Sequence, residues 1–247
     1  MHIFYFVLFV VGSSETKLSM AEFLGDLVLN NDVKVLVART VGLSLINILK
    51  SGNIQSREAA LKALNQMSSH DASARILIEA GILPPLVKDL FTVGAHQLPM
   101  RLKEVSATIL ANVVSSGYDF DSVPVGPEQQ TLVSEDIIHN LLHLISNTGP
   151  AIECKLLQVL VGLTNSLITI SSVVSAIKSS GATISLVQFI EAPQKDLRLA
   201  SIKLLQNISP YMGPELASCL RGTSGQLGSL IKIILENIGI TEEQAAA

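Results

Sequence analysis

The sequence contains no Trp, and aromatic residues make up only 4% of its 247 positions. Charged residues are also sparse at 15%, whereas hydrophobic residues reach 48%. A chain this apolar can bury a substantial core, which argues against intrinsic disorder. Because Leu, Ile, Val and Ala supply that core, closely stacked helices are favoured. The formal net charge of −4 and the pI near 5.7 give no electrostatic basis for binding nucleic acid.

Cysteine is nearly absent as well. Two residues, Cys154 and Cys219, are too few for a disulfide framework or a zinc site. Neither has a histidine nearby in the sequence, and both fall on apolar helical faces, so a catalytic thiol is not predicted. We expect two buried thiols in a reducing compartment.

A continuous apolar run occupies residues 2–11. It is about as long as a signal-peptide core, but no Lys or Arg precedes it, and a bilayer takes roughly 20 residues to span. Three explanations stay open: a wrongly assigned first exon or fragment start, which we favour, a weak membrane anchor, and secretion. We therefore separate residues 1–18 from a repeat region at 19–247, whose pattern begins at Ser19.

An aliphatic step recurs five times along the repeat region. Each copy has two adjacent aliphatic residues and a third one three positions later, and the copies begin at Leu45, Leu86, Leu141, Leu186 and Leu230. Successive copies start 41, 55, 45 and 44 residues apart. A helical apolar stripe that returns at this interval is typical of a stacked helical repeat and not of a single-core enzyme.

A second landmark keeps the same rhythm. Ahead of each aliphatic step lies a leucine followed, three residues on, by another aliphatic residue; these landmark leucines are Leu24, Leu64, Leu110, Leu160 and Leu205. They are separated by 40, 46, 50 and 45 residues. Two independent patterns with one period strengthen the prediction of a helical repeat.

The second repeat shows the expected unit, which is one long helix, one short helix and one long helix. Ser56 is placed to cap the first helix. The short helix is expected over residues 71–80, where Gly81 ends it. Pro84 and Pro85 suit the start of the last helix, because a missing N–H costs little there.

Other repeats vary on this unit. In the third, residues 118–130 contain Asp119, Asp121 and several Pro and Gly, which predicts an exposed loop. In the fourth, Gly181 is expected to end the middle helix. Residues 241–247 begin like a capped helix. Because solenoids need polar capping units at their ends, we expect this chain to be part of a longer protein, truncated at both ends.

Three helices in about 40 to 47 residues resemble the armadillo/HEAT class. The stretch at 81–87 and the sequence Asn207-Ile208-Ser209 are similar to armadillo repeats in particular. This resemblance covers residues 19–247 and implies an all-α, right-handed superhelical armadillo-repeat solenoid of about five three-helix units.

Three segments, 30–38, 101–112 and 140–150, further resemble the armadillo region of plant U-box ubiquitin ligases, and among these the senescence-associated, plasma-membrane-associated group. In that family a U-box recruits a ubiquitin-conjugating enzyme, and the armadillo array contacts substrates or places the ligase at a membrane. No segment of this sequence resembles a U-box. The resemblance therefore does not imply enzyme activity for this chain.

Motifs that could carry other chemistry are incomplete. His139 and His143 share a helix face, but no Glu lies between them and no third metal ligand is evident. Asp119 and Asp121 lack the Gly and Glu of a calcium loop. The glycines at 222–228 have no Lys that could hold a phosphate. We expect no metal and no cofactor.

The last helix of each armadillo unit lines a concave groove, so the resemblance makes its polar positions candidates for partner contact. The alternative for each position is a merely hydrated surface. Nuclear-import armadillo proteins bind basic peptides with a ladder of Trp and Asn, which a chain without Trp cannot provide. The candidates are Asn47, Lys50, Lys88, Asp89, His139, His143, Gln188 and Lys232.

Taken together, the resemblance implies a protein-interaction module that is the substrate-recognition or targeting region of a plant U-box ligase. Its partners would be protein substrates or adaptors in the groove, with no nucleic acid and no small-molecule substrate. Its location would be cytoplasmic, with peripheral association at the inner face of the plasma membrane. Two alternatives stay open: a ligase in its own right, and a stand-alone armadillo scaffold or adaptor unrelated to ubiquitin.

Overall fold

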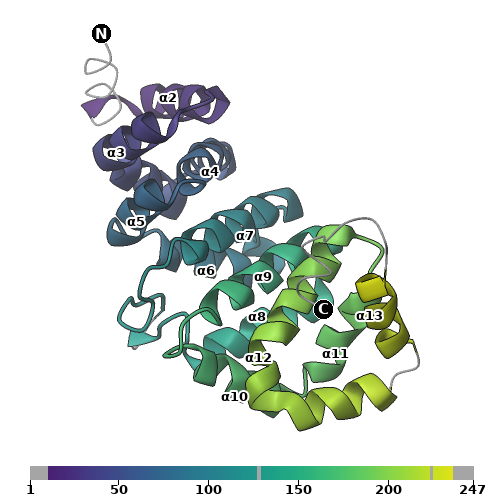
Figure 1. The fold of residues 1–247 in the computed structure, drawn as a ribbon. Coiled ribbons are helices and arrows are strands. Elements are labelled where there is room, and N and C mark those ends of the chain that lie inside the picture. The colour runs from purple at the N-terminus through teal and green to yellow at the C-terminus, as the bar shows by residue number, and fades with distance from the viewer. Residues whose placement is uncertain (1–10, 127–128, 223–224, 236–247) are drawn as a thin grey trace. The chain divides into compact units, whose positions relative to one another are not determined.

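The computed structural model describes residues 11–126, 129–222 and 225–235, and it divides the chain into two compact units (Figure 1). The first unit contains α2 to α7, and the second contains α8 to α13. Within the described ranges the regular elements are helices only. The all-α class predicted from the sequence is therefore confirmed, whereas the helix start expected at 241–247 and nearly all of the apolar run at 2–11 lie outside the described residues.

The helices of the first unit follow one another in a stack (Figure 1). The longest is α3, and α4 packs against α2, α3, α5 and α7. Helix α2 begins at Ser14 and runs through residue 18, so the expected boundary between residues 18 and 19 falls inside a helix. The elements are α2 (Ser14–Asp26), α3 (Asn31–Ser51), α4 (Ile54–Ser68), α5 (Asp71–Glu79), α6 (Leu83–Phe91), η1 (Gly94–His96) and α7 (Met100–Ser115).

Asparagine side chains begin two of these helices. Asn30 Oδ1 accepts a hydrogen bond from the Val33 N–H at 2.9 Å, and Asn53 Oδ1 accepts one from the Ser56 N–H at 2.9 Å. Each bond satisfies an amide that has no partner inside the helix. The prediction that Ser56 caps α4 was wrong, because Asn53 caps the helix and Ser56 already lies within its first turn.

Helices α4, α5 and α6 form a three-helix unit at the predicted place, but the prediction of a long last helix was wrong, because α6 has nine residues and is as short as α5. Gly81 follows α5 with φ +83°, a left-handed conformation that glycine adopts without strain. Pro84 lies at the start of α6, as expected. The hydroxyl of the buried Ser73 donates to the carbonyl of Met67, which ties the start of α5 to the end of α4.

The second unit repeats this pattern with variations. Gly181 ends α10 with φ +67°, as predicted. Thr169 donates to the carbonyl of Leu163, six residues earlier, as Ser73 does in the first unit. Helix α12 is kinked at Met212, whose φ is −135°. The elements are α8 (Glu135–Asn147), α9 (Pro150–Leu163), α10 (Ile170–Ser180), α11 (Thr183–Gln188), η3 (Phe189–Glu191), α12 (Lys195–Gly222) and α13 (Gln226–Leu235).

Two repeats depart from the three-helix unit. In the first, α3 is one helix of 21 residues instead of a short and a long one. In the third, no α-helix occurs among the described residues between α7 and α8, where the sequence predicts a loop. Asp119 and Asp121 are exposed in this loop, as expected, but Phe120 and Val125 are only 4% and 3% exposed. The loop is therefore anchored by buried apolar side chains.

The core follows the two sequence landmarks. The landmark leucines Leu24, Leu64, Leu110 and Leu160 are at most 4% exposed, and Leu205 is half-buried. The aliphatic steps that begin at Leu45, Leu86, Leu141 and Leu186 are buried on α3, α6, α8 and α11 with η3. The fifth step differs, since Leu230 is half-buried and Ile231 is 49% exposed. Apolar burial of this extent is the main stabilising contribution to such a fold.

Candidate partner-binding clefts

The first unit contains a cleft of about 470 Å³ between the end of α3, the first turn of α4, and α6. Apolar contacts come from Leu49, Leu98 and the two prolines of α6. Its polar lining is mostly basic and consists of Lys50, Arg57, Lys88, Asp89, Thr92 and His96. We call this the first cleft.

An ion pair between Arg57 and Asp89 lies in the wall of the first cleft. The Asp89 side chain is only 5% exposed and that of Arg57 is 21% exposed. Arg57 Nε and Asp89 Oδ2 are both buried and have no hydrogen-bond partner within the part of the chain that the structure describes. The pair therefore presents one unused donor and one unused acceptor beside the cleft.

The carboxyl group of Asp89 is buried, which disfavours its charged form. Burial raises its pKa above the usual 3.8, although the neighbouring Arg57, Lys88 and Lys103 oppose the shift. Lys103 is itself 5% exposed, and burial lowers the pKa of its ammonium group. Lys103 Nζ donates to the Thr92 carbonyl at 2.7 Å and to the Leu90 carbonyl at 3.2 Å, so it closes the end of α6. The surroundings of Asp89 are thus cationic on several sides.

The second unit contains a cleft of about 450 Å³ between the end of α8, the start of α9, and α11 with η3. Its lining includes the carboxylates of Glu153 and Glu191 together with Ser146 and Gln188. Burial raises the pKa of Glu153. Neither Lys nor Arg belongs to the lining that the structure describes. We call this the second cleft.

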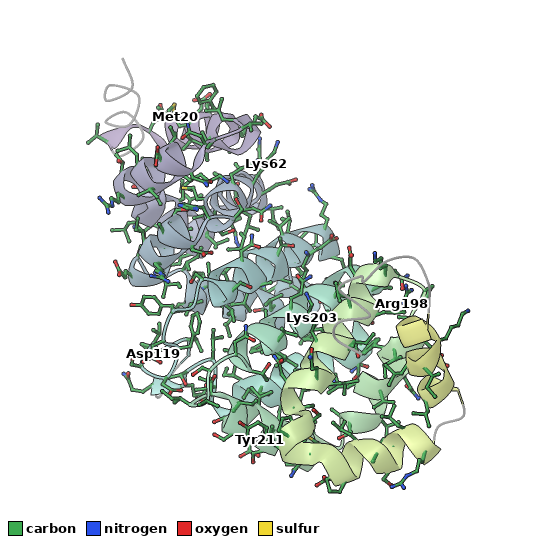
Figure 2. All side chains as sticks on the ribbon, viewed as in Figure 1. Met20, Lys62, Asp119, Arg198, Lys203 and Tyr211 are labelled. Atoms are coloured by element: carbon green, nitrogen blue, oxygen red, sulfur yellow. The ribbon has the colours of Figure 1, made fainter. Side chains whose placement is uncertain are left out.

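Arg57 and Glu153, which line the two clefts, occupy the same position of the repeat, and this position is charged in two further repeats as well. The fourth residue of α4, α7, α9 and α12 lies seven positions before a landmark leucine; these residues are Arg57, Lys103, Glu153 and Arg198. Arg198 (Figure 2) donates to the carbonyls of Ala192 and Pro193 at 3.0 and 3.2 Å, much as Lys103 bonds the end of α6. Cations are favoured beside such helix C-terminal carbonyls.

The residues predicted for partner contact fall into distinct environments. Lys50 and Lys88 are exposed in the first cleft, and Gln188 is exposed in the second. Asn47, His143 and Lys232 are exposed but line neither cleft. Asp89 was expected on a solvent-facing surface, yet its pairing with Arg57 holds it almost fully buried.

His139 is half-buried and already bonded. Its Nε2 lies 2.8 Å from Ser179 Oγ and 3.8 Å from Glu135 Oε1. It forms no metal-ligand group with His143, since no cluster of three or more His, Cys, Asp or Glu occurs within the described ranges. Its partners connect α8 to α10 within the second unit.

The cysteines lie in different surroundings. Cys154 is 7% exposed, as predicted, while Cys219 is half-buried. Burial raises the pKa of the Cys154 thiol above the usual 9.0, which keeps it in the unreactive protonated form.

No single helix of the described ranges has the length and hydropathy needed to cross a membrane. The segments Ile170–Ser180 and Thr183–Glu191 meet that requirement only as a pair, with a bend of 100° between them.

Sequence reasoning missed Arg57, His96, Glu153 and Glu191 as lining residues. Arg57 and Glu153 belong to the first helix of their units, whereas only the last helices were considered. The spacing of seven residues before a landmark leucine is the signal that identifies both.

Solved structures with the same architecture include designed armadillo-repeat proteins. A designed armadillo repeat protein matches with a TM-score of 0.72 at 16% identity. Another, computationally designed for modular peptide recognition, gives 0.71 at 17%, and a third, in complex with the peptide (KR)4, gives 0.69 at 18%. Each match covers 98% of this chain and 94% of the other. The chain therefore has the armadillo-repeat fold.

The sequence is similar to plant U-box proteins. It is 67% identical over 237 residues to U-box domain-containing protein 44 of Arabidopsis thaliana and 66% identical over 238 residues to U-box domain-containing protein 43 of the same plant. It is 52% identical over 250 residues to U-box domain-containing protein 24 of Oryza sativa subsp. japonica. Each match covers 96% of this chain, but the chain spans only 29 to 30% of the length of these relatives. No family model matches the chain.

Proposed function

We propose that this chain is the partner-binding region of a plant U-box ubiquitin ligase and acts in substrate recognition or targeting. The observation that carries the proposal is the 67% identity to U-box domain-containing protein 44 across 96% of the chain. The armadillo fold and its two polar clefts support a role in binding. Recognition of this kind requires surfaces and no catalytic side chain.

In such a ligase, one region binds the partner and another region binds the ubiquitin-conjugating enzyme. A segment of the partner lies in one or both clefts and is held there by charged and polar side chains. The U-box elsewhere in the ligase holds a ubiquitin-conjugating enzyme. Binding then raises the effective concentration of the partner's lysines near that enzyme, and the rate of transfer rises without a catalytic group in this chain.

An exchange experiment tests this function. The segment of U-box domain-containing protein 44 that matches this chain is replaced by the chain itself, and the chimera is expressed in Arabidopsis thaliana that lacks that relative. We expect the chimera to restore the wild-type phenotype, whereas a version from which the matching segment has been deleted should not restore it. A chimera that is expressed and autoubiquitinates but fails to rescue would contradict the proposal. That outcome would favour a scaffold that has diverged from ligase function.

A second assay concerns the chain alone. We propose that it has no ligase activity of its own. When the purified chain is mixed with ubiquitin, activating enzyme and conjugating enzyme, no ladder of ubiquitinated products is expected. A ladder would show that the chain is a ligase in isolation.

The proposed location is the cytoplasm, with peripheral contact at the inner face of the plasma membrane through the repeat region. Because Ser13 caps α2, a truncated chain should begin at Gly12 to keep that helix intact. We expect the truncated and the complete chains to distribute equally between membrane and soluble fractions. If only the complete chain sediments with membranes, residues 1–11 and not the repeats are the anchor.

A further inference from the structure

The two clefts are built from equivalent positions of the repeat. Three lining residues of each cleft occupy the same positions of the repeat. The first residue lies five positions after the start of an aliphatic step, and the second lies seven positions before the next landmark leucine. The third residue lies two positions after the start of the following aliphatic step. The equivalent pairs are Lys50 and Ser146, Arg57 and Glu153, and Lys88 and Gln188.

At all three positions the first cleft carries a cation where the second carries a neutral or acidic side chain. Lys50, Arg57 and Lys88 outweigh the single carboxylate of Asp89, which leaves the first cleft with a formal charge of +2 when His96 is neutral. The second cleft contains two carboxylates and no Lys or Arg in its described lining. The first cleft is therefore a basic site on a chain whose net charge is −4.

The cations of the first cleft divide into two kinds. Arg57 is committed to Asp89 in the wall. Lys50 and Lys88 are exposed, and neither takes part in an ion pair within the described residues. Their ammonium groups are available to carboxylates of a partner, and such pairing also speeds encounter.

We propose that the first cleft binds an acidic segment of the partner protein, with Asp or Glu side chains paired to Lys50 and Lys88. This inference rests on the proposed role of the chain in partner binding. It gives that partner a chemistry, and it assigns the contact to the first cleft and not to the second.

The Arg57–Asp89 pair belongs to the wall of the first cleft and not to its contact surface. The buried Asp89 Oδ2 lacks a donor and the buried Arg57 Nε lacks an acceptor within the described residues. Because both atoms are buried, a bound segment contacts the exposed lysines and not this pair. The volume of about 470 Å³ lies within the range of sites that enclose a short ligand segment.

A direct binding experiment tests the inference with the complete chain. A short fluorescein-labelled peptide of alternating Glu and Ser is titrated with purified protein, and fluorescence anisotropy is recorded at low and at physiological salt. Matched peptides of alternating Lys and Ser and of alternating Gln and Ser serve as references. We expect the acidic peptide to bind at least about tenfold more tightly than either reference, with an affinity that falls as salt rises.

Paired charge reversals locate the binding. The double variant Lys50→Glu with Lys88→Glu should bind the acidic peptide about tenfold or more weakly than the wild-type chain. The double variant Lys195→Glu with Arg221→Glu changes the net charge by the same amount at exposed positions of the second unit and should bind within about twofold of wild type. Circular dichroism and thermal unfolding confirm that both variants fold.

Three results would overturn the inference. The first is equal binding of the acidic and basic peptides, and the second is an equal loss in both double variants. The third is full displacement of the peptide by vesicles containing phosphatidylserine, which would identify a membrane-binding surface. The chimera experiment remains separate: rescue by a chimera with Lys50→Glu and Lys88→Glu would refute this inference and leave the proposed function standing.

Discussion

Asn112 of α7 donates its side-chain amide to the Ser68 hydroxyl of α4 at 3.0 Å, which joins two repeats across 44 residues of sequence. The second unit contains the same bond, because Asn207 Nδ2 of α12 donates to Thr164 Oγ1 at 2.9 Å. In both cases the donor lies two residues after a landmark leucine, and the hydroxyl lies four residues after the preceding one. The repeat thus extends from apolar positions to specific hydrogen bonds.

Replacing Asn112 by Ala should lower the free energy of unfolding by about 1–2 kcal/mol, because the partner hydroxyl of Ser68 is only 2% exposed. Urea unfolding followed by circular dichroism measures the change. The exposed Asn140→Ala is the matched control and should cost no more than about 0.5 kcal/mol. A double variant with Ser68→Ala should lose less than the two single variants together; strict additivity would show that the bond contributes nothing.

Gly181 should be intolerant of a side chain for a backbone reason. Its φ of +67° is left-handed, and nothing lies within 4 Å of an added Cβ, so strain and not a clash sets the cost. We expect Gly181→Ala to lower the thermal stability by about 1 kcal/mol and Gly181→Asn to lower it less. Gly213, which is free of neighbours and lacks a positive φ, is the control. A larger loss for Gly213→Ala than for Gly181→Ala would contradict this explanation.

The two thiols should differ in reactivity. Burial raises the pKa of Cys154, with Lys155 opposing the shift and Asp196 adding to it, and the residue is 7% exposed. Cys219 is half-buried. Titration with a disulfide reagent at mildly alkaline pH should therefore modify Cys219 first, and Cys154 only when urea unfolds the chain. The folded variant Cys219→Ser should react only slowly with the reagent. A fast phase that survives this substitution would identify Cys154 as an activated thiol.

The fold was largely predictable because apolar periodicity reports burial directly. Four of the five landmark leucines and the first four aliphatic steps are buried as their spacing required. Details that depend on local competition were not predictable. Asn53 and Ser56 both suit a helix cap, and only the backbone decides that Asn53 caps α4. The loss of the middle helix in the third repeat likewise depends on how Phe120 and Val125 are buried.

The clefts were only partly predictable. Lys50, Lys88 and Gln188 were identified because they lie on the last helices of their repeats. Arg57 and Glu153 were missed because only the last helices of the repeats were considered, and both residues lie on the first helix of their repeat. The burial of Asp89 depends on a partner 32 residues away, and local sequence does not encode such a pairing.

Asp89 should make the stability of the first unit depend on pH. Burial raises the pKa of its carboxyl, with Arg57 opposing the shift, so the folded chain holds this proton more tightly than the unfolded chain does. Its contribution to stability is therefore complete below the unfolded pKa of 3.8 and is lost as pH rises through the higher folded value. The free energy of unfolding is measured with urea for the wild-type chain and for Asp89→Asn across this pH window. The value for the wild type minus the value for the variant should fall as pH rises and then become constant. A difference that instead grows with pH would mean that the ion pair with Arg57 outweighs the cost of burying the carboxylate.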